Sequence, residues 1–139
     1  MVYEATATIA ADPATIWSIL TDAAGYPDWD SGVVRIEGTI ADGEKIKLVS
    51  EVDPGRTFTL KVADVRPGEG MRWSGGMPLG LFRGVRTFRL EPDGDGQTRF
   101  TLREELSGAM AGMITKKMPD MGPSFEQFAN GLKARAEAG

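Results

Sequence analysis

The sequence predicts an α+β protein in which a curved antiparallel sheet of seven strands wraps around one long C-terminal helix. Three observations lead to this prediction. Apolar and polar residues alternate in seven short runs, separated by turns rich in Gly, Pro and Asp. The connections between the later runs are too short for crossover helices, so neighbouring strands must pair antiparallel. The C-terminal segment follows helical spacing and carries an apolar stripe that would cover the sheet.

The first strand and two short helices open the chain. Residues Val2–Ile9 alternate strictly, which is typical of a half-buried strand. Asp12 precedes a proline, and this N-cap followed by proline at the first helical position predicts a helix over Pro13–Leu20. A glycine and a proline inside Ala23–Trp29 limit the second helix to a short one or a turn.

Six further strands are predicted at Val33–Ile40, Glu44–Val52, Arg56–Arg66, Met71–Gly75, Val85–Glu91 and Gln97–Leu106. The turn-forming separators are Ala41–Gly43, Asp53–Gly55, Pro67–Gly70 and Pro92–Gly96. In four of these strands the even-numbered positions are apolar, and the odd-numbered ones are mostly Lys, Arg and Thr. One face of the sheet is therefore covered and the other meets water. The turn before Met71 leaves the register of Trp73 open by one residue.

The cover for the sheet is the C-terminal segment. Its apolar residues at helical spacing are Met110, Met113, Met121, Phe125, Phe128 and Leu132, with Met118 close to the same stripe. Pro119, Gly122 and Pro123 interrupt this pattern and predict a kink or a brief break. The stripe is either plain core or the flexible lining of a binding cavity. Lys117 lies beside it, and a surface position is the simpler interpretation.

Two charged residues are predicted to face each other on the covered side of the sheet. If the last hairpin turns near Asp95, the pairs are Leu90 with Phe100, Phe88 with Leu102 and Arg86 with Glu104. Directly opposed residues have Cβ atoms roughly 5 Å apart, which suits an ion pair. Burying either charge unpaired would cost several kcal/mol, so each needs a partner or water. The pair is either an internal salt bridge or the polar anchor of a ligand.

The composition excludes several classes of function. The chain has 16 Lys and Arg, 20 Asp and Glu, a net charge of −4, and neither Cys nor His. Disulfides, thiol nucleophiles, imidazole bases and zinc sites are therefore excluded. A mildly acidic chain without a basic run is a poor binder of nucleic acid. No apolar stretch approaches the roughly 18–20 residues of a membrane span, so we expect a single cytoplasmic domain over residues 1–139 without integral membrane association.

Two segments resemble cofactor motifs without matching them. Asp93, Asp95, Gln97 and Glu104 imitate calcium-loop spacing, but Thr98 stands where that loop needs glycine, so an acidic hairpin turn is expected. The glycine-rich segment 75–82 matches neither the dinucleotide nor the P-loop pattern. We therefore expect no metal and no cofactor.

The order and spacing of several segments resemble the START-like or SRPBCC superfamily, in its bacterial polyketide cyclase/dehydrase-like branch. The matching segments are Ala11–Trp17, Leu20–Asp22, Tyr26–Trp29, Met71–Gly75, Gly84–Phe88, Gly96–Arg99 and Glu104–Gly108. The resemblance covers nearly the whole chain. It implies a helix-grip fold with a deep apolar cavity between the sheet and the long helix. Members bind lipids, sterols, polyketides or other hydrophobic molecules, only some are enzymes, and no shared catalytic motif carries over.

The resemblance turns these patterns into a predicted site. The glycine-rich segment would lie near the cavity mouth, where Met77, Leu79, Leu81 and Phe82 form either a flexible lid or an ordinary connection. Trp73 could stack on a planar ligand. The expected ligand-binding residues are Phe58, Leu60, Trp73, Met77, Leu81, Phe82, Arg86, Phe88, Leu102, Glu104, Met110, Met113, Lys117, Met121 and Phe125.

The leading hypothesis is a protein that binds a small hydrophobic molecule, such as a lipid, a polyketide or an aromatic compound. The first alternative is a cyclase, aromatase or dehydratase. Without histidine its proton acceptor would have to be Glu104, a buried Asp64 or Tyr26. The second alternative is a protein-binding regulatory module. The oligomeric state is left open.

Overall fold

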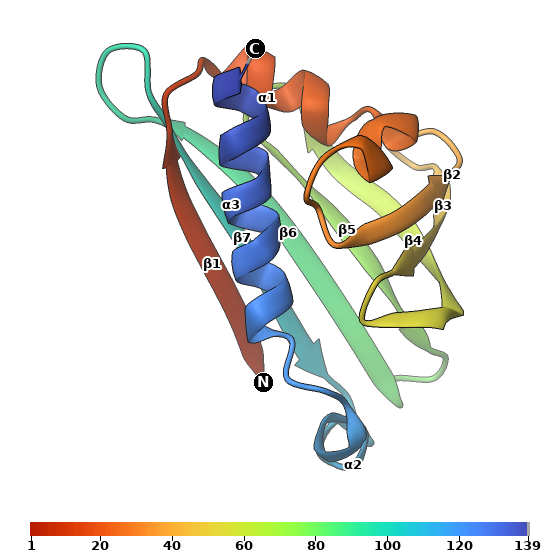
Figure 1. The fold of residues 1–139 in the computed structure, drawn as a ribbon. Helices are drawn as coiled ribbons and strands as arrows, with labels where there is room; N and C mark the ends of the chain where they lie inside the picture. Colours follow the sequence, from red (N-terminus) through yellow and green to blue (C-terminus); the bar gives the residue numbers. More distant parts are fainter. Residues whose placement is uncertain (139) are drawn as a thin grey trace.

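The computed structural model describes residues 1–138 and confirms the predicted α+β architecture (Figure 1). Its elements follow the order β1 (Val2–Ile9), α1 (Pro13–Leu20), η1 (Ala23–Asp28), β2 (Val33–Glu37), β3 (Lys45–Ser50), β4 (Asp53–Arg66), β5 (Gly70–Met77), β6 (Phe82–Pro92), β7 (Thr98–Ser107), α2 (Ala111–Lys117) and α3 (Gly122–Ala138). No helix among these is long and apolar enough to cross a membrane.

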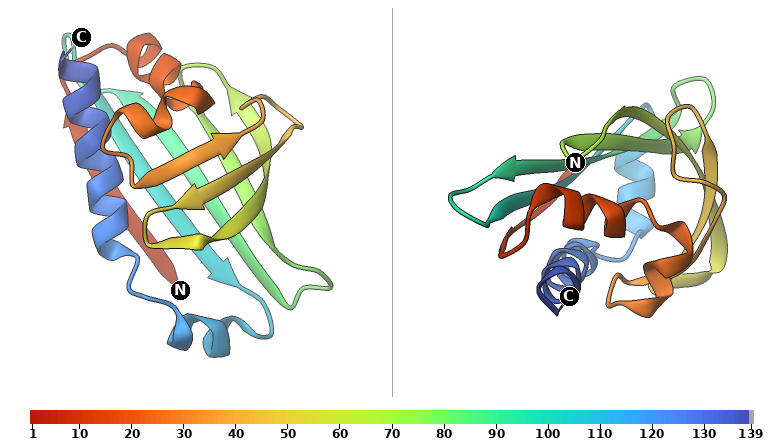
Figure 2. Two further views of the ribbon diagram at one scale, coloured as in Figure 1. Left: turned by 45° about the vertical axis from the view of Figure 1, so that its right-hand side comes forward. Right: turned by 90° about the horizontal axis from the view of Figure 1, so that it is seen from above.

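All seven strands form one antiparallel sheet in the order β1-β7-β6-β5-β4-β3-β2. The sheet curves toward the side on which α1, η1 and α3 lie, as the view from above in Figure 2 shows. α3 packs along β1 and β7, at one edge of the sheet, while η1 packs against β2 at the other. The register of the β6–β7 hairpin is the predicted one, with Leu90 opposite Phe100 and Phe88 opposite Leu102.

Several strand boundaries differ from the prediction, most clearly those of β4 and β2 and those beside the β5–β6 turn. The turn after β3 lies at Glu51–Val52, and β4 already begins at Asp53, where a turn was expected. Pro54 is tolerated on the β5 side of β4, because the pairing of β4 with β5 begins only at Lys61. The missing N–H of this proline therefore breaks no hydrogen bond between β4 and β5. β2 ends at Glu37 rather than Ile40, since Gly38 follows with a φ of +106° and turns the chain.

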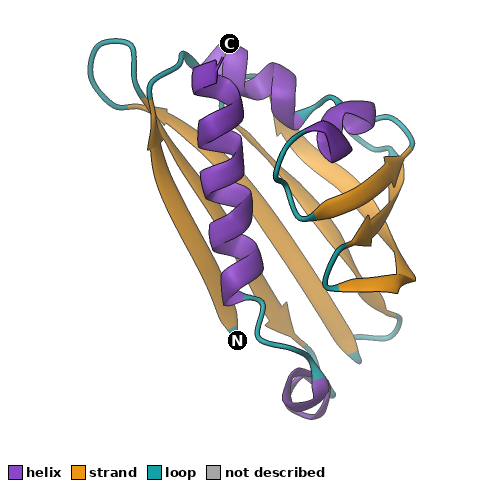
Figure 3. Ribbon diagram, in the orientation of Figure 1, coloured by secondary structure: helices purple, strands orange, loops and turns teal. Residues whose placement is uncertain are grey.

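The C-terminal segment is broken in the predicted place. α2 ends at Lys117 and α3 begins at Gly122, so the prolines separate two helices instead of bending one. α2 lies beyond the end of the sheet, whereas α3 runs along it (Figure 3). Met110 and Met118 flank α2, Met113 lies within it and Met121 precedes α3, so these methionines do not form one stripe on a long helix, and that part of the prediction is wrong. Met113 on α2 is 56% exposed.

One end of the sheet, which we call the hairpin end, carries the β5–β6 turn (residues 78–81), α2 and the N-terminus. Hydrogen bonds hold these parts together: the Ala109 and Met110 amides donate to the Gly80 and Leu81 carbonyls, and the Leu106 amide donates to the Met1 carbonyl. The opposite end carries the β6–β7 turn.

Two carboxylates, the N-cap Asp12 of α1 and Glu137 of α3, predict how stability changes in acid. Interactions with the side chain and then the amide of Thr15 lower the pKa of Asp12, the N-cap of α1. The Ala10 amide, followed by Lys133, lowers the pKa of Glu137 on α3. Lowered pKa values in the folded state mean that this stabilisation is present above the ordinary carboxyl pKa and is lost as the pH falls through the folded-state values.

We therefore expect the melting temperature to fall as the pH is lowered below about 4. Asp12→Asn keeps an oxygen acceptor for the cap but cannot be protonated, so this variant should lose less stability between neutral and acidic pH than the wild type. Thermal unfolding of both proteins across this range measures the difference. Asp93→Asn, in the exposed β6–β7 turn, is the control. If Asp12→Asn lost as much stability between neutral and acidic pH as the wild type does, the cap would not contribute to the loss of stability in acid.

Candidate functional site

The candidate site is built on one row of residues that runs across the sheet. Val62 on β4 pairs with Trp73 on β5, and Trp73 pairs with Arg86 on β6. Arg86 pairs with Glu104 on β7, and Glu104 pairs with Tyr3 on β1. Because paired residues point to the same face, all five side chains lie on the concave face of the sheet. This settles the register of Trp73.

Arg86 and Glu104 form the predicted ion pair. The Arg86 Nε donates to Glu104 Oε1 at 3.3 Å, and both side chains are 18% exposed. The guanidinium carbon lies 4.9 Å from the centre of the Phe125 ring, and that ring packs against Tyr3 at 5.6 Å. The first turn of α3 and an aromatic residue of β1 therefore hold the arginine in place.

The pair leaves most of its hydrogen-bonding capacity unused. Within residues 1–138, the contact from Nε to Oε1 is the one hydrogen bond that either side chain makes. The two terminal nitrogens of Arg86 keep their N–H groups for another acceptor, and a guanidinium presents these donors in a planar fork. A carboxylate, a carbonyl or an enolate oxygen matches that geometry. An anion at this position would also gain from the positive charge.

Directly beside this pair, toward the hairpin end, two neighbouring strands of the sheet carry glycine. In the adjacent row Gly75 pairs with Gly84, and Gly84 pairs with Leu106, so two neighbouring strands carry no side chain there. A Cβ built at Gly84 would meet one heavy atom within 4 Å, the Leu106 Cδ2, in a tight contact of 3.2 Å, so the room is limited on the Leu106 side. At Gly75 the Leu60 side chain already fills the corresponding position. We call the part of the concave face over Gly84, next to Arg86, the Gly84 space.

The concave face is filled on the other side of this row. Trp73 and Phe88 have ring centres 4.6 Å apart, and Tyr26 lies 6.2 Å from Trp73. Phe128 of α3 closes the cluster from above, with Phe88 6.0 Å and Phe100 6.1 Å away. The expected deep cavity beneath the long helix is thus occupied by aromatic rings along this part of α3.

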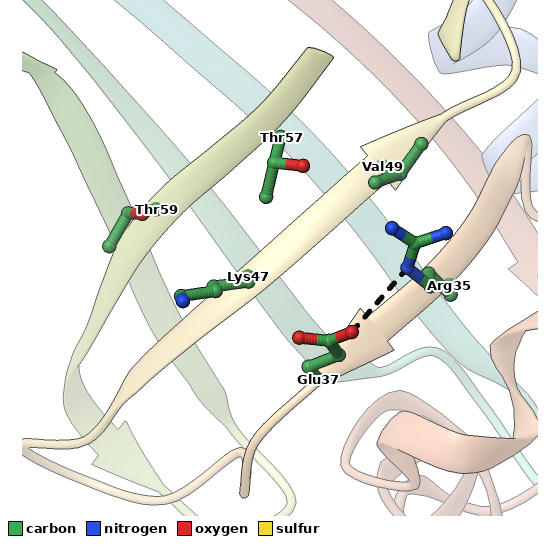
Figure 4. Close-up of a pocket in the computed structure, with 6 residues that line it drawn as sticks. All are labelled: Arg35, Glu37, Lys47, Val49, Thr57 and Thr59. Atoms are coloured by element: carbon green, nitrogen blue, oxygen red, sulfur yellow. Dashed lines mark ion pairs between the residues drawn. The ribbon is translucent and has the colours of Figure 1, made fainter. Parts of the chain in front are cut away.

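Two distinct hollows of the described chain lie elsewhere. One, of about 380 Å³, opens on the outer face over β2, β3 and β4 (Figure 4). It is lined by Arg35, Glu37, Lys47, Val49, Thr57 and Thr59. Its cations and hydroxyls, and the ion pair of Arg35 with Glu37 at 3.6 Å, make it unsuitable for an apolar molecule. The second hollow, of about 440 Å³, surrounds the β5–β6 turn and reaches Gly75.

The structure separates the predicted ligand-binding residues into three groups. Trp73, Phe88, Leu102 and Phe125 are at most 2% exposed and contact one another or the core. Arg86, Glu104, Phe58, Leu60, Leu81, Phe82, Met110 and Met121 are half-buried. Met77, Met113 and Lys117 are exposed. Lys117 therefore has the surface position that was the simpler interpretation, whereas Met113 does not line a cavity beneath the helix.

Two of the three candidate proton acceptors are excluded by their surroundings. Asp64 was expected to be buried, but its side chain is 64% exposed and forms an ion pair with Arg72 on the outer face. Its φ of +53° marks a bulge that turns it outward. Tyr26 is buried, its hydroxyl donates to the Leu20 carbonyl, and burial raises its pKa far above the ordinary value. Glu104 alone remains.

The glycine-rich segment 75–82, expected to be a lid or a connection, is instead the end of a hairpin. β5 continues to Met77 and β6 begins at Phe82, and these two residues pair with each other. The turn between them is four residues long and places Leu79 in water, at 94% exposure. A flexible lid over the cavity is therefore not present, because most of the segment is hydrogen-bonded strand.

The prediction missed Tyr3 and the Gly84 space as parts of the site. Tyr3 lies on the apolar side of the first strand, but the order of strands in the sheet, which puts β1 beside β7, cannot be read from alternation alone. Gly75 and Gly84 lie in a segment rich in glycine, and such a composition fits a loop as well as it fits a strand. Their even spacing from Arg86 and Trp73 was the available signal, since residues two apart in a strand share a face.

Comparisons with known proteins identify the family and the fold of this chain. Residues 2–137 match the family model for polyketide cyclase / dehydrase and lipid transport. No protein with a curated function matches the chain in sequence. Three solved structures illustrate the likeness of fold. The ZhuI aromatase/cyclase from Streptomyces sp. R1128 has a TM-score of 0.75 and 17% identity, over 99% of this chain and 93% of that one.

A START superfamily protein from Mycobacterium smegmatis has a TM-score of 0.73 and 20% identity, over 99% of this chain and 97% of that one. Protein MLL2253 from Mesorhizobium loti has a TM-score of 0.76 and 15% identity, with 99% and 98% covered. At these identities the structures show the fold, while the family model covers almost every residue of the chain. The chain belongs to the polyketide cyclase / dehydrase and lipid transport family, and its curved sheet around a C-terminal helix is the helix-grip fold of START-like proteins.

Proposed function

We propose that this protein binds a small, mainly apolar molecule that carries an acidic or carbonyl group, with its polar group on Arg86 and its apolar part in the Gly84 space. One observation carries the proposal: a half-buried guanidinium with unused N–H groups lies next to a part of the concave face where two paired glycines leave the sheet without side chains. The family, which includes lipid transport and polyketide cyclisation, supports a ligand of this chemistry. The composition continues to favour a location in the cytoplasm.

Typical interaction energies indicate how much the apolar part and the polar part of the ligand each contribute to the affinity. Burying about 200 Å² of apolar surface gains roughly 5 kcal/mol at 25 cal/mol per Å². A charge-assisted hydrogen bond contributes about 1.5–3 kcal/mol. Apolar burial therefore supplies most of the affinity, and Arg86 determines which end of the ligand lies inward. Half-buried apolar side chains near the same end, Phe58, Leu60, Phe82 and Met121, are available for that burial.

The test uses 1-anilinonaphthalene-8-sulfonate, an aromatic anion whose fluorescence rises when it binds an apolar site. Arg86→Met removes the charge and keeps much of the apolar stem, and we expect it to weaken probe binding about tenfold. Gly84→Leu fills the Gly84 space and should weaken binding by a similar factor. Glu104→Gln removes the competing carboxylate, so the anionic probe should bind several-fold more tightly.

Gly94→Asn is the matched control for added volume, because nothing lies within 4 Å of that glycine at the opposite end of the sheet. Circular dichroism confirms that each variant is folded. Equal affinity in wild type, Arg86→Met and Gly84→Leu would refute the proposed site. Native mass spectrometry of the freshly purified protein complements the probe, since a co-purified lipid or aromatic compound would identify the natural ligand class.

A cyclase or dehydratase reaction is the second candidate, and Glu104 is the observation that favours it. Its carboxylate has an unused oxygen and faces the same space as Arg86. A substrate enolate held by Arg86 could exchange a proton with this group. If the protein is an enzyme, Glu104→Gln should abolish turnover of a polyketide-like substrate while it retains probe binding. Retained turnover in this variant would exclude Glu104 as the catalytic acid or base.

A further inference from the structure

The hairpin end concentrates the exposed apolar side chains of the molecule. Seven large apolar residues are exposed within residues 1–138, and five of them are at this end. They are Met1 at 59%, Val2 at 48%, Met77 at 43%, Leu79 at 94% and Met113 at 56%. Monomeric proteins rarely gather exposed apolar groups in one place unless that place binds something.

Leu79 is the most unusual of these residues. It lies at the tip of the β5–β6 turn with a φ of +62°, a conformation in which Gly or Asn is the favoured residue. A leucine there adds backbone strain and, at 94% exposure, gains almost no contact inside the molecule. Two unfavourable features without an internal benefit point to a contact outside the chain.

Basic residues lie on the elements next to this apolar tip. Arg83 follows the turn, and Lys116 and Lys117 occupy the last turn of α2. None of these three side chains forms an ion pair with any residue that the structure describes. The nearby acids are fewer: Glu105 pairs with Arg103, and Asp120, which accepts from the Gly122 amide at the start of α3, keeps its single negative charge. The hairpin end is therefore locally positive, although the whole chain has a net charge of −4.

We propose that the hairpin end docks on the surface of an anionic phospholipid bilayer, with Leu79, Met77 and Met113 inserted among the lipids. Arg83, Lys116 and Lys117 would then lie against the anionic headgroups. An exposed apolar tip with flanking cations has the chemistry of a reversible interfacial contact. A second copy of this chain fits less well, because a symmetric contact would bring the same cations together. The Gly84 space lies between Arg86 and this end of the sheet, so docking would bring it nearer to the lipids.

The docking proposal does not depend on the proposed ligand site. The test is co-sedimentation with vesicles of phosphatidylcholine alone and of phosphatidylcholine and phosphatidylserine in equal parts. We expect the wild type to bind the mixed vesicles, to bind the neutral ones weakly, and to dissociate as salt is raised. Leu79→Asp should weaken binding to the mixed vesicles at least tenfold. Lys116→Glu with Lys117→Glu should do the same.

Matched controls separate a local contact from a general change in charge. Lys45→Glu with Lys61→Glu makes the same change in net charge on the outer face of the sheet, and Val34→Asp places the same acid on β2. Both controls should bind as the wild type does. Three results would overturn the proposal: no binding to the mixed vesicles, equal losses in the controls, or dimerisation by light scattering that Leu79→Asp abolishes while vesicle binding is absent.

The two proposals can fail separately. Leu79→Asp should retain binding of the naphthalene sulfonate probe in the absence of vesicles, because residue 79 lies outside the Arg86 site. Arg86→Met should retain vesicle binding. Loss of both activities in a single variant, with an altered circular dichroism spectrum, would indicate misfolding and is checked before either result is used.

Discussion

Replacing Gly131 with alanine is expected to lower the free energy of unfolding by roughly 3 kcal/mol, although alanine is the better helix former. Gly131 lies inside α3, where the helix meets the loop between η1 and β2. A Cβ built at this position would lie 1.9 Å from the Asp30 carbonyl oxygen and 2.7 Å from its carbonyl carbon. The obstacle is backbone, so it cannot rotate away as a side chain would.

Gly131→Ala lowers the stability only if the cost of the steric clash is larger than the gain in helix propensity. Higher helix propensity favours alanine by about 1 kcal/mol, whereas overpacking against a fixed backbone costs about 1–3 kcal/mol and sometimes more. The loop has little freedom to retreat, because Gln127, one helical turn earlier, donates to the Asp30 carboxylate at 2.7 Å and to Glu51 at 3.2 Å. The steric term should therefore decide.

Gly112→Ala is the matched control for this prediction. Gly112 also lies inside a helix, α2, but nothing is within 4 Å of its added Cβ. The same substitution there should leave stability unchanged or raise it by up to about 1 kcal/mol. Chemical denaturation of the three proteins gives both differences. If Gly131→Ala were as stable as Gly112→Ala, the close approach of α3 to the loop would be wrong.

Local patterns were sufficient to predict most of the fold. Alternation placed the apolar face of each strand, and a symmetric turn near Asp95 placed Arg86 opposite Glu104, because antiparallel pairing is fixed once the turn is centred. The break before α3 also followed from local chemistry, since proline cannot continue a helix. These features depend on neighbours close in sequence.

The errors arose where contacts between distant segments decide the structure. The pattern of residues 75–84 is that of a loop, yet pairing of Met77 with Phe82 extends both strands to the turn. Asp64 lies in a strand at an apparently inward position, but a bulge in the pairing with β5 turns it outward. The methionines of the C-terminal segment do follow helical spacing, but the predicted stripe does not line the sheet. This part of the prediction failed because α2 packs at the end of the sheet rather than along it.

The absence of histidine has a sharper meaning once these positions are known. Burial and a hydrogen bond remove Tyr26 as a base, and exposure removes Asp64, so the concave face offers a single carboxylate, Glu104. That carboxylate is already paired with the cation that would hold a ligand. An arrangement of this kind favours binding, since any chemistry would require Glu104 to be released from Arg86 and to remain close to the ligand.

Replacing Phe128 with alanine is expected to lower the free energy of unfolding by about 3–5 kcal/mol. Phe128 is 3% exposed and lies at the centre of the aromatic cluster beneath α3. Its ring centre is 5.1 Å from Trp29, 6.1 Å from Tyr26 and 6.0 Å from Phe88. No neighbour can collapse into the space, because each ring is held by its own strand or helix, so the cavity would persist.

The same variant tests how far the ligand site extends along α3. If the ligand is confined to the Gly84 space, Phe128→Ala should bind the naphthalene sulfonate probe with the affinity of the wild type, because the new cavity lies on the other side of the Arg86 row. If Phe128→Ala does not fold, Phe128→Leu replaces it in this test, because its expected loss in the free energy of unfolding is about half as large. Tighter or additional probe binding in either variant would show instead that the aromatic cluster occupies part of the binding space and that its packing limits the size of the ligand.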